Sequence, residues 1–116
     1  MKIALDIVAG VLALAALGSA VGKLRRAPAV VEALAGVGVT PQQLPVLAAV
    51  EIAGALGLLV GIWSKPLGVA ASIGFTLYFL GAVASHVRVR AKMNELVAPA
   101  LLALLAVVTV VLELKR

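Results

Sequence analysis

Four long runs of apolar residues constrain this chain more than any other feature of its sequence. They extend over residues 3–22, 44–63, 67–84 and 96–112. A transmembrane helix needs about 20 mostly apolar residues, because each residue advances ~1.5 Å across a hydrocarbon layer of ~30 Å. None of the runs alternates with the period of two that a membrane β-strand requires. Because backbone groups in lipid must bond within the chain, the runs predict four membrane-spanning helices.

The composition agrees with a membrane protein and excludes several other classes. Of the 116 residues, 64% are hydrophobic and 13% are charged, whereas a soluble domain has about half and about a quarter. The absence of cysteine excludes disulfides, thiol redox relays and thiolate metal sites. The basic residues behind the net charge of +5 lie between the apolar runs, where anionic lipid headgroups are simpler partners than nucleic acid. We therefore expect a single membrane domain over residues 1–116, in contact with the lipid bilayer and not with nucleic acid.

The segments between and within the runs predict how the helices connect and pack. Residues 28–37 are too few to span and place their apolar residues on one face, which predicts a short amphipathic helix at the membrane interface. Small residues recur at helical spacing in the first two runs, as Ala9, Ala13, Ala16, Gly18, Ala20 and Gly22, and as Ala49, Ala53, Gly57 and Gly61. Such rows let helix backbones approach closely. The expected fold is all-α, an antiparallel bundle of four transmembrane helices with a short interfacial helix between the first two.

An antiparallel bundle brings most of the ionisable residues to one membrane face, which we call side A. Side A holds the end of the first and third spans and the start of the second and fourth, with Lys23, Arg25, Arg26, His86, Arg88, Arg90, Lys92 and Asn94. The opposite face, side B, holds Lys2, Asp6, Lys65, Glu113, Lys115 and Arg116. Side A has six Lys or Arg residues and side B has four. By the positive-inside rule, this small excess weakly favours an orientation in which side A, the side of Lys23 and His86, faces the cytoplasm.

Glu51 is the one ionisable residue that the sequence places deep inside a span. It lies seven residues into the second run, about 10 Å below side A. An ionised carboxylate at that depth costs several kcal/mol unless it is paired or faces water. Its candidate partners are Lys23, His86 and Arg88 from side A as charged groups, and Tyr78, near the level of Glu51, as a neutral donor. Two interpretations follow: a buried ion pair between helices, or a cavity in which the carboxylate moves a proton or binds a ligand.

The other candidate residues also have two interpretations each. His86 either is solvated by headgroups at the interface or exchanges protons near neutral pH. Arg88 either extends to lipid phosphates or acts as an anion clamp over the cavity. One His and one Glu fall short of a metal ligand set, and a haem on His86 could become bis-His only with a second chain. The sequence thus assigns Glu51 and His86 as candidate catalytic residues and Lys23, Tyr78 and Arg88 as candidate ligand-binding residues, with no metal site.

Several short motifs, taken in order, resemble the DoxX-like family of small integral membrane proteins. They are Gly22-Lys23-Leu24, Glu51-Ile52-Ala53-Gly54, Pro66, Gly81-Ala82 and His86-Val87-Arg88. The resemblance extends from about Gly18 to the C-terminus and implies a four-helix bundle in the bacterial cytoplasmic membrane. Some members of the family are linked to quinone-dependent thiosulfate oxidation or to membrane oxidoreductase complexes. Without cysteine this chain cannot carry disulfide chemistry, which favours a quinone-facing or partner-dependent role.

Three functional hypotheses follow from these observations. The first is a redox-associated subunit with a small cavity around Glu51 for a quinone or another lipophile. The second is a membrane enzyme of the epoxide isomerase or hydrolase type, in which Glu51 is the acid–base group or nucleophile and Lys23 or Tyr78 polarises the leaving oxygen. The third is a non-catalytic assembly protein whose glycine rows recruit a partner helix. Each of the three hypotheses is compatible with membrane or redox partner proteins and with a homo-oligomer.

Overall fold

The computed structural model describes residues 2–89 and 93–116, and the elements in these ranges are all helical. They are α1 (Lys2–Leu24), α2 (Pro28–Ala35), the 3-10 turn η1 (Pro41–Gln43), α3 (Leu44–Val60), α4 (Lys65–Arg88) and α5 (Met93–Lys115). Four helices are long and apolar enough to cross a membrane, the second of them being α3 together with η1. The predicted all-α fold with four spanning helices is confirmed, and a short helix lies between the first two as expected.

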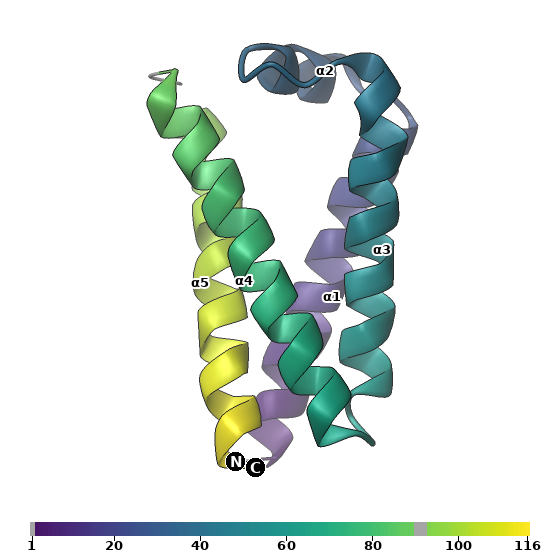
Figure 1. The fold of residues 1–116 in the computed structure, drawn as a ribbon, viewed down its shortest axis with the longest axis vertical. Helices are drawn as coiled ribbons and strands as arrows, with labels where there is room; N and C mark the ends of the chain where they lie inside the picture. The colour runs from purple at the N-terminus through teal and green to yellow at the C-terminus, as the bar shows by residue number, and fades with distance from the viewer. Residues whose placement is uncertain (1, 90–92) are drawn as a thin grey trace.

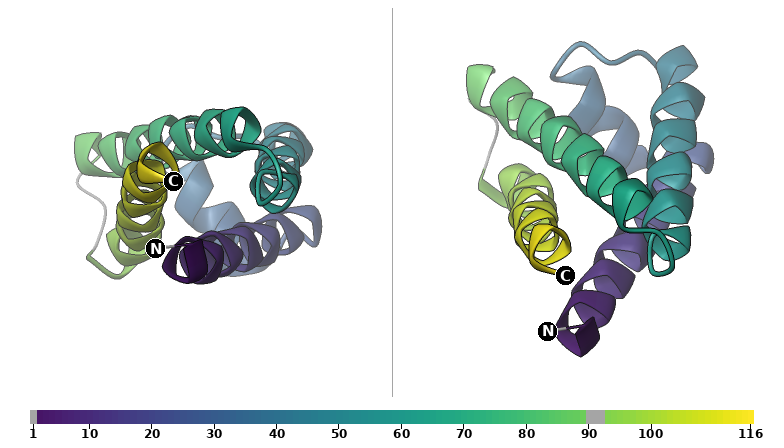
Figure 2. Two further views of the ribbon diagram at one scale, coloured as in Figure 1. Left: turned by 90° about the horizontal axis from the view of Figure 1, so that it is seen from below. Right: turned by 60° about the horizontal axis from the view of Figure 1, so that its bottom comes forward.

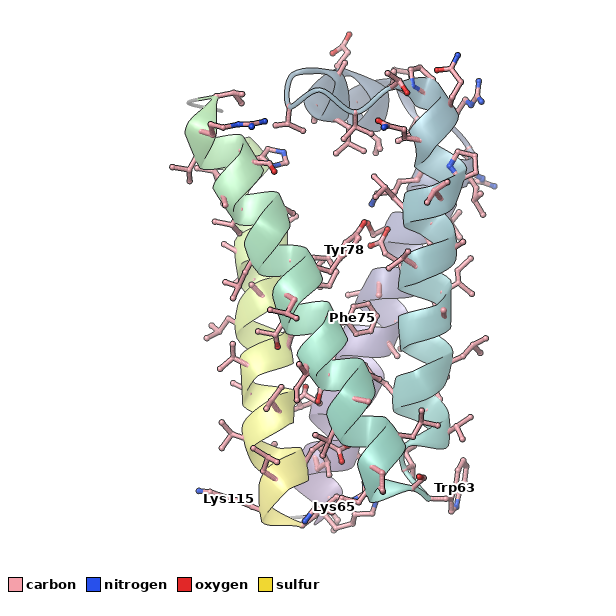
Figure 3. The ribbon with its side chains drawn as sticks, viewed as in Figure 1. Trp63, Lys65, Phe75, Tyr78 and Lys115 are labelled. Atoms are coloured by element: carbon pink, nitrogen blue, oxygen red, sulfur yellow. The ribbon has the colours of Figure 1, made fainter. Side chains whose placement is uncertain are left out.

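The second span ends earlier than the apolar run predicts. α3 stops at Val60 instead of Trp63, because the chain turns immediately afterwards toward α4. The amides of Ile62, Trp63 and Ser64 bond to carbonyls three residues back instead of four, which tightens the backbone into this turn. Trp63 is 82% exposed at the tip of the turn, on side B (Figure 3). The other three long helices extend past their apolar runs, since such a run marks only the part of a helix that is immersed in lipid.

The four long helices form an antiparallel bundle in which each one packs against two others (Figures 1 and 2). α1 packs most closely against α3, and α4 against α5; weaker contacts join α3 to α4 and α1 to α5. The N- and C-terminal ends and the α3–α4 turn lie together at side B (Figure 1). α2 lies across the side A end, has no buried residue and contacts α1.

Each long helix buries one stripe of mostly small or apolar side chains. The stripes comprise Leu5, Ala9, Leu12, Ala13, Ala16 and Ala20 on α1, Leu44, Ala48, Ala55 and Leu58 on α3, Gly68, Ser72, Phe75 and Phe79 on α4, and Ala103, Ala106 and Thr109 on α5. The outward faces carry exposed Leu, Ile and Val, as expected for contact with acyl chains. Four ionisable residues also belong to the buried stripes: Lys23, Glu51, His86 and Glu113.

The contact between α3 and α4 is tight at side B and widens toward side A. From side B upward the facing pairs are Gly61 with Gly68, Gly57 with Ala71, Gly54 with Phe75, and then Glu51 with Tyr78. A Cβ added to Gly61 would lie 2.6 Å from the Cα of Gly68, so the two backbones touch there. Because the facing side chains become larger along this series, the two helices diverge, as Figure 1 shows.

The bundle uses only part of the predicted small-residue rows. Gly57 of α3 and Gly61, the residue that follows α3, contact α4, but Ala49 and Ala53 of the same row are exposed. A Cβ added to Gly18 on α1 would meet no atom within 4 Å. Of the small residues predicted to pack on α1, Gly18 therefore makes no such contact and Gly22 faces Val30 of α2, whereas the alanines Ala9, Ala13, Ala16 and Ala20 are buried in the bundle.

Candidate functional site

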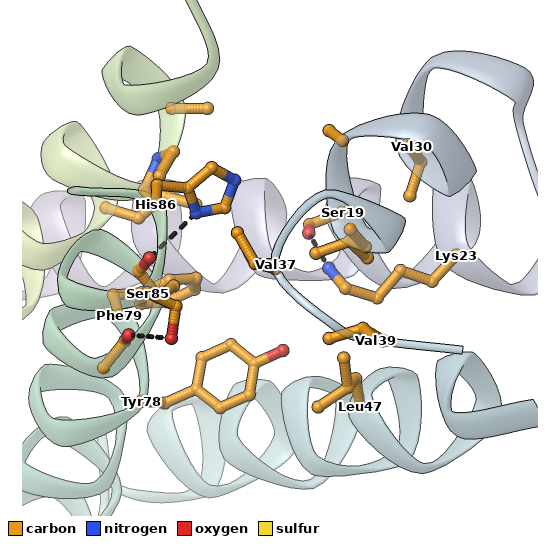
Figure 4. Close-up of a pocket in the computed structure, with 17 residues that line it drawn as sticks. Ser19, Lys23, Val30, Val37, Val39, Leu47, Tyr78, Phe79, Ser85 and His86 are labelled. Carbon is orange, nitrogen blue, oxygen red and sulfur yellow. Dashed lines mark hydrogen bonds between the residues drawn. The ribbon is translucent and has the colours of Figure 1, made fainter. Parts of the chain in front are cut away.

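A cavity of about 320 Å³ lies between the diverging helices at side A (Figure 4). It is lined by Ser19, Lys23, Val30, Ala33, Leu34, Val37, Val39, Leu47, Tyr78, Phe79, Gly81, Ala82, Ser85, His86, Ala98, Pro99 and Leu102. All four long helices, α2 and the segment after α2 contribute to these walls. Most of the lining is apolar, and the polar side chains are those of Ser19, Lys23, Tyr78, Ser85 and His86.

Lys23 and Glu51 form a buried ion pair between α1 and α3. Lys23 Nζ lies 2.7 Å from Glu51 Oε1 and also donates a hydrogen bond of 2.7 Å to Ser19 Oγ, one turn earlier on α1. Glu51 is fully buried and Lys23 is 8% exposed. The pair joins two helices, in agreement with the interpretation of Glu51 as part of a buried ion pair. Lys23 also lines the cavity, in agreement with the interpretation of the region as a ligand site.

Glu51 lies behind the cavity wall and is not one of the lining residues. Lys23 is paired with it, and the hydroxyl of Tyr78 faces the same carboxylate. Neither oxygen of the Glu51 carboxylate has a hydrogen-bond partner among the described residues, so its contact with Lys23 is an ion pair only. A ligand in the cavity would therefore contact Lys23 and Tyr78 directly, and Glu51 would affect it only through its interactions with these two residues.

His86 lies on the opposite wall from Lys23, in the last turn of α4 (Figure 4). Its Nδ1 is 2.8 Å from the carbonyl oxygen of Ala82, and the residue is only 6% exposed. Because a carbonyl oxygen only accepts hydrogen bonds, this contact requires a proton on Nδ1. In the neutral ring, Nε2 is then a free acceptor. The structure places His86 in the cavity wall, at the end of α4.

Arg88 is, with Glu51, one of two predicted site residues that do not line the cavity. It is exposed at the end of α4 and does not line the cavity. Two residues along an α-helix correspond to a rotation of about 200°. Since His86 faces the cavity, Arg88 is directed away from it. The predicted side A residues Arg90 and Lys92 lie outside the described residues.

Sequence reasoning missed two features of the polar interior. Ser19 accepts a hydrogen bond from Lys23. The sequence indicates this contact only through the four-residue spacing, at which two side chains lie on the same helix face. Glu113, expected at the surface of side B, is 1% exposed and packs its carboxylate against Gly68. Its Oε2 lies 3.3 Å from Nη1 of Arg116. Glu51 is therefore not the only buried carboxylate of the bundle.

The fold and the cavity define a small multi-pass membrane protein that encloses a mostly apolar cavity and a buried ion pair at one end of a four-helix bundle. The chain belongs to the DoxX-like family, whose model matches residues 7–109. The match begins in α1, ends in α5 and includes all of the cavity-lining residues as well as Glu51. The family resemblance of the sequence motifs is thereby confirmed. No curated protein and no solved structure matches the chain.

Proposed function

We propose that this protein binds a small lipophilic molecule in the side A cavity, as a redox-associated membrane subunit, with a quinone as the first candidate. The proposal rests on the cavity, whose mostly apolar walls carry Lys23 on α1 and, across from it, Tyr78 and His86 on α4, with the Tyr78 hydroxyl directed toward Lys23 (Figure 4). Ligand cavities usually measure about 300–1,000 Å³ and carry a few polar groups that orient the ligand. A volume of about 320 Å³ favours a single-ring molecule over a haem.

The polar groups favour a ligand with an oxygen atom at each end. The Lys23 ammonium has three donors; one of them bonds to Ser19, and the positive charge is paired with Glu51. A further N–H of Lys23 can donate to one ligand oxygen, and His86 Nε2 can accept from a hydroxyl at the other end. A ring with oxygens on opposite sides, as in a quinone and its reduced form, matches this arrangement. Because Glu51 already balances the charge of Lys23, a neutral ligand is favoured over an anion.

Filling the cavity should abolish binding of such a ligand. Ala98 lines the cavity, whereas Ala100 on the same helix is exposed and does not line it. Ala98→Phe is expected to weaken binding of a quinone without an isoprenoid tail by at least about tenfold, or ~1.4 kcal/mol, because the phenyl ring occupies the ligand's space. Ala100→Phe should leave the affinity unchanged. Isothermal titration calorimetry of the detergent-purified protein measures both, and equal affinities of the two variants would contradict the proposal.

The geometry favours binding over an enzyme in which Glu51 reacts with the substrate. A reacting group must touch the substrate, and Glu51 lies behind Lys23 and Tyr78. Turnover of a small lipophilic epoxide that is lost in Glu51→Gln would support the enzyme hypothesis instead. A quinone that binds neither the wild type nor any variant would favour the assembly-protein hypothesis.

We also propose that the protein resides in the cytoplasmic membrane with side A facing the cytoplasm, in keeping with the distribution of Lys and Arg. Since the chain has no cysteine, a single substitution introduces a unique thiol. Arg25 and Lys65 are exposed at side A and side B. In intact cells a membrane-impermeant maleimide should label Lys65→Cys and not Arg25→Cys. The reverse pattern would show the opposite orientation.

A further inference from the structure

We infer that the cavity selects ligands that carry a free hydroxyl group at the His86 end, so that an aromatic diol binds more tightly than the corresponding quinone. The inference rests on the proposed function, because it assumes that a small ring with oxygen substituents enters the cavity. It adds the chemical form of that ligand and assigns His86 and Ser85 as the residues that select it.

His86 presents a hydrogen-bond acceptor to the cavity. Its Nδ1 lies 2.8 Å from the carbonyl oxygen of Ala82, which holds the proton of the neutral ring on Nδ1. The second ring nitrogen, Nε2, then has a lone pair and no proton. His86 lines the cavity, and its ring extends from α4 toward the wall that carries Lys23 (Figure 4). A ligand group that bonds to Nε2 must therefore bring its own proton.

Ser85 adds a second acceptor to the same wall. Its Oγ donates a hydrogen bond of 2.9 Å to the carbonyl oxygen of Gly81, so its one proton is already in use (Figure 4). The lone pairs of this oxygen remain available, and Ser85 lines the cavity beside His86. Because both side-chain protons are bound to backbone carbonyls of α4, these two side chains offer a ligand only acceptors.

The opposite end of the cavity does not distinguish a diol from a quinone. Lys23, which is paired with Glu51, has only donors. A hydroxyl oxygen and a carbonyl oxygen both accept a hydrogen bond from such a group. The Tyr78 hydroxyl is directed toward Lys23 and belongs to this end as well (Figure 4). The selection must therefore take place at His86 and Ser85.

A quinone and a diol meet the two acceptors differently. The carbonyl oxygen of a quinone would face the lone pairs of Nε2 and Oγ with no proton between them, and the surrounding wall is mostly apolar. A buried acceptor without a partner lowers the affinity. The hydroxyl of a diol donates to Nε2 instead, and a site built around such a bond rejects the analogue that lacks the proton. We therefore expect a preference of at least about tenfold for the diol.

Isothermal titration calorimetry with a matched pair of ligands tests the inference. The probes are tetramethylhydroquinone and tetramethyl-1,4-benzoquinone, which share one carbon skeleton and have neither a tail nor an unsubstituted ring carbon. Detergent-purified wild-type protein is titrated with each under nitrogen at about pH 8, where an imidazole is mostly neutral. The hydroquinone should bind at least about tenfold more tightly. Partitioning of the probes into micelles is the same for every variant, so a change in the ratio of the two affinities between variants reports on the site.

Two substitutions of His86 should remove the preference from opposite directions. His86→Gln places an amide near the position of Nε2, and its N–H can donate to a carbonyl, so binding of the quinone should strengthen about tenfold. His86→Leu removes the acceptor and should weaken binding of the hydroquinone about tenfold, with the quinone unchanged. Val87→Leu is the control, at an exposed position that does not line the cavity, and should alter neither affinity. His86 variants that weaken both ligands equally would assign the residue a structural role and overturn the inference.

The titrations of the wild type separate this inference from the proposed function. If the two probes bind with equal affinity, or the quinone binds more tightly, the preference is overturned while the cavity remains a ligand site. If neither probe binds, the proposed function is overturned together with the preference. Ala98→Phe should weaken both probes alike, because it occupies the space of the ring whatever the ring carries.

Discussion

Replacing Lys23 by methionine is expected to lower the free energy of unfolding by about 3–5 kcal/mol, because the fully buried Glu51 carboxylate loses its counter-charge. Methionine keeps much of the length of the lysine side chain and removes its charge and its donors. Lys115→Met is the matched control on an exposed lysine, and its effect should stay within about 0.5 kcal/mol. Far-UV circular dichroism during titration of detergent micelles with sodium dodecyl sulfate measures both.

The second partner of the ion pair provides the decisive comparison. Glu51→Met alone should also destabilise the protein, since it leaves the Lys23 ammonium buried and unpaired. The double variant Lys23→Met/Glu51→Met should recover most of the loss, because an apolar pair of similar volume often replaces a buried ion pair without penalty. Losses that simply add in the double variant would show that the two residues do not interact.

Gly61→Ala is expected to destabilise the bundle by about 3 kcal/mol, the upper end of the usual range for overpacking. Its new Cβ would lie 2.6 Å from the Cα of Gly68, and a backbone atom cannot rotate aside as a side chain can. The controls are Gly74→Ala and Gly81→Ala on α4, where a Cβ would meet no atom within 4 Å. These two should stabilise the helix by about 0.5–1 kcal/mol.

The same detergent titration distinguishes the three glycine variants. A free energy of unfolding that is equal for Gly61→Ala and Gly74→Ala would contradict the close contact between α3 and α4 at side B. The comparison is well matched, because the same methyl group is added in each variant and only its neighbours differ.

The number of spans could be predicted from the sequence, but not the face that each helix turns inward. In water, the contrast between polar and apolar residues marks the buried face of a helix. In lipid both faces are apolar, so the glycine row and the alanine row of α1 look alike in sequence. The structure buries Ala16 and Ala20 and leaves Gly18 free of contacts within the bundle. Only rare polar residues such as Lys23 and Glu51 mark the inward stripe.

Part of the candidate site was also predictable, because depth in a helix follows from counting residues. This arithmetic places Tyr78 near the level of Glu51, and the structure brings the two side chains together. The direction in which a side chain points also depends on how the helix is rotated about its axis, and counting residues does not give that rotation. For this reason the sequence assigns Arg88 to the site, although the structure exposes it. The burial of Glu113 depends on Gly68 of another helix, a contact that no pattern within α5 reveals.

The tight contact between Gly61 and Gly68 has a mechanical consequence for the far end of the molecule. Because α3 and α4 are in backbone contact at side B, a tilt of the two helices about this contact changes the distance between their side A ends. A ligand wider than the cavity would have to move the side A ends of α3 and α4 apart, against the surrounding acyl chains. Under the proposed function, the width of the ligand that fits would therefore depend on Gly61 and Gly68 as well as on the side chains that line the cavity.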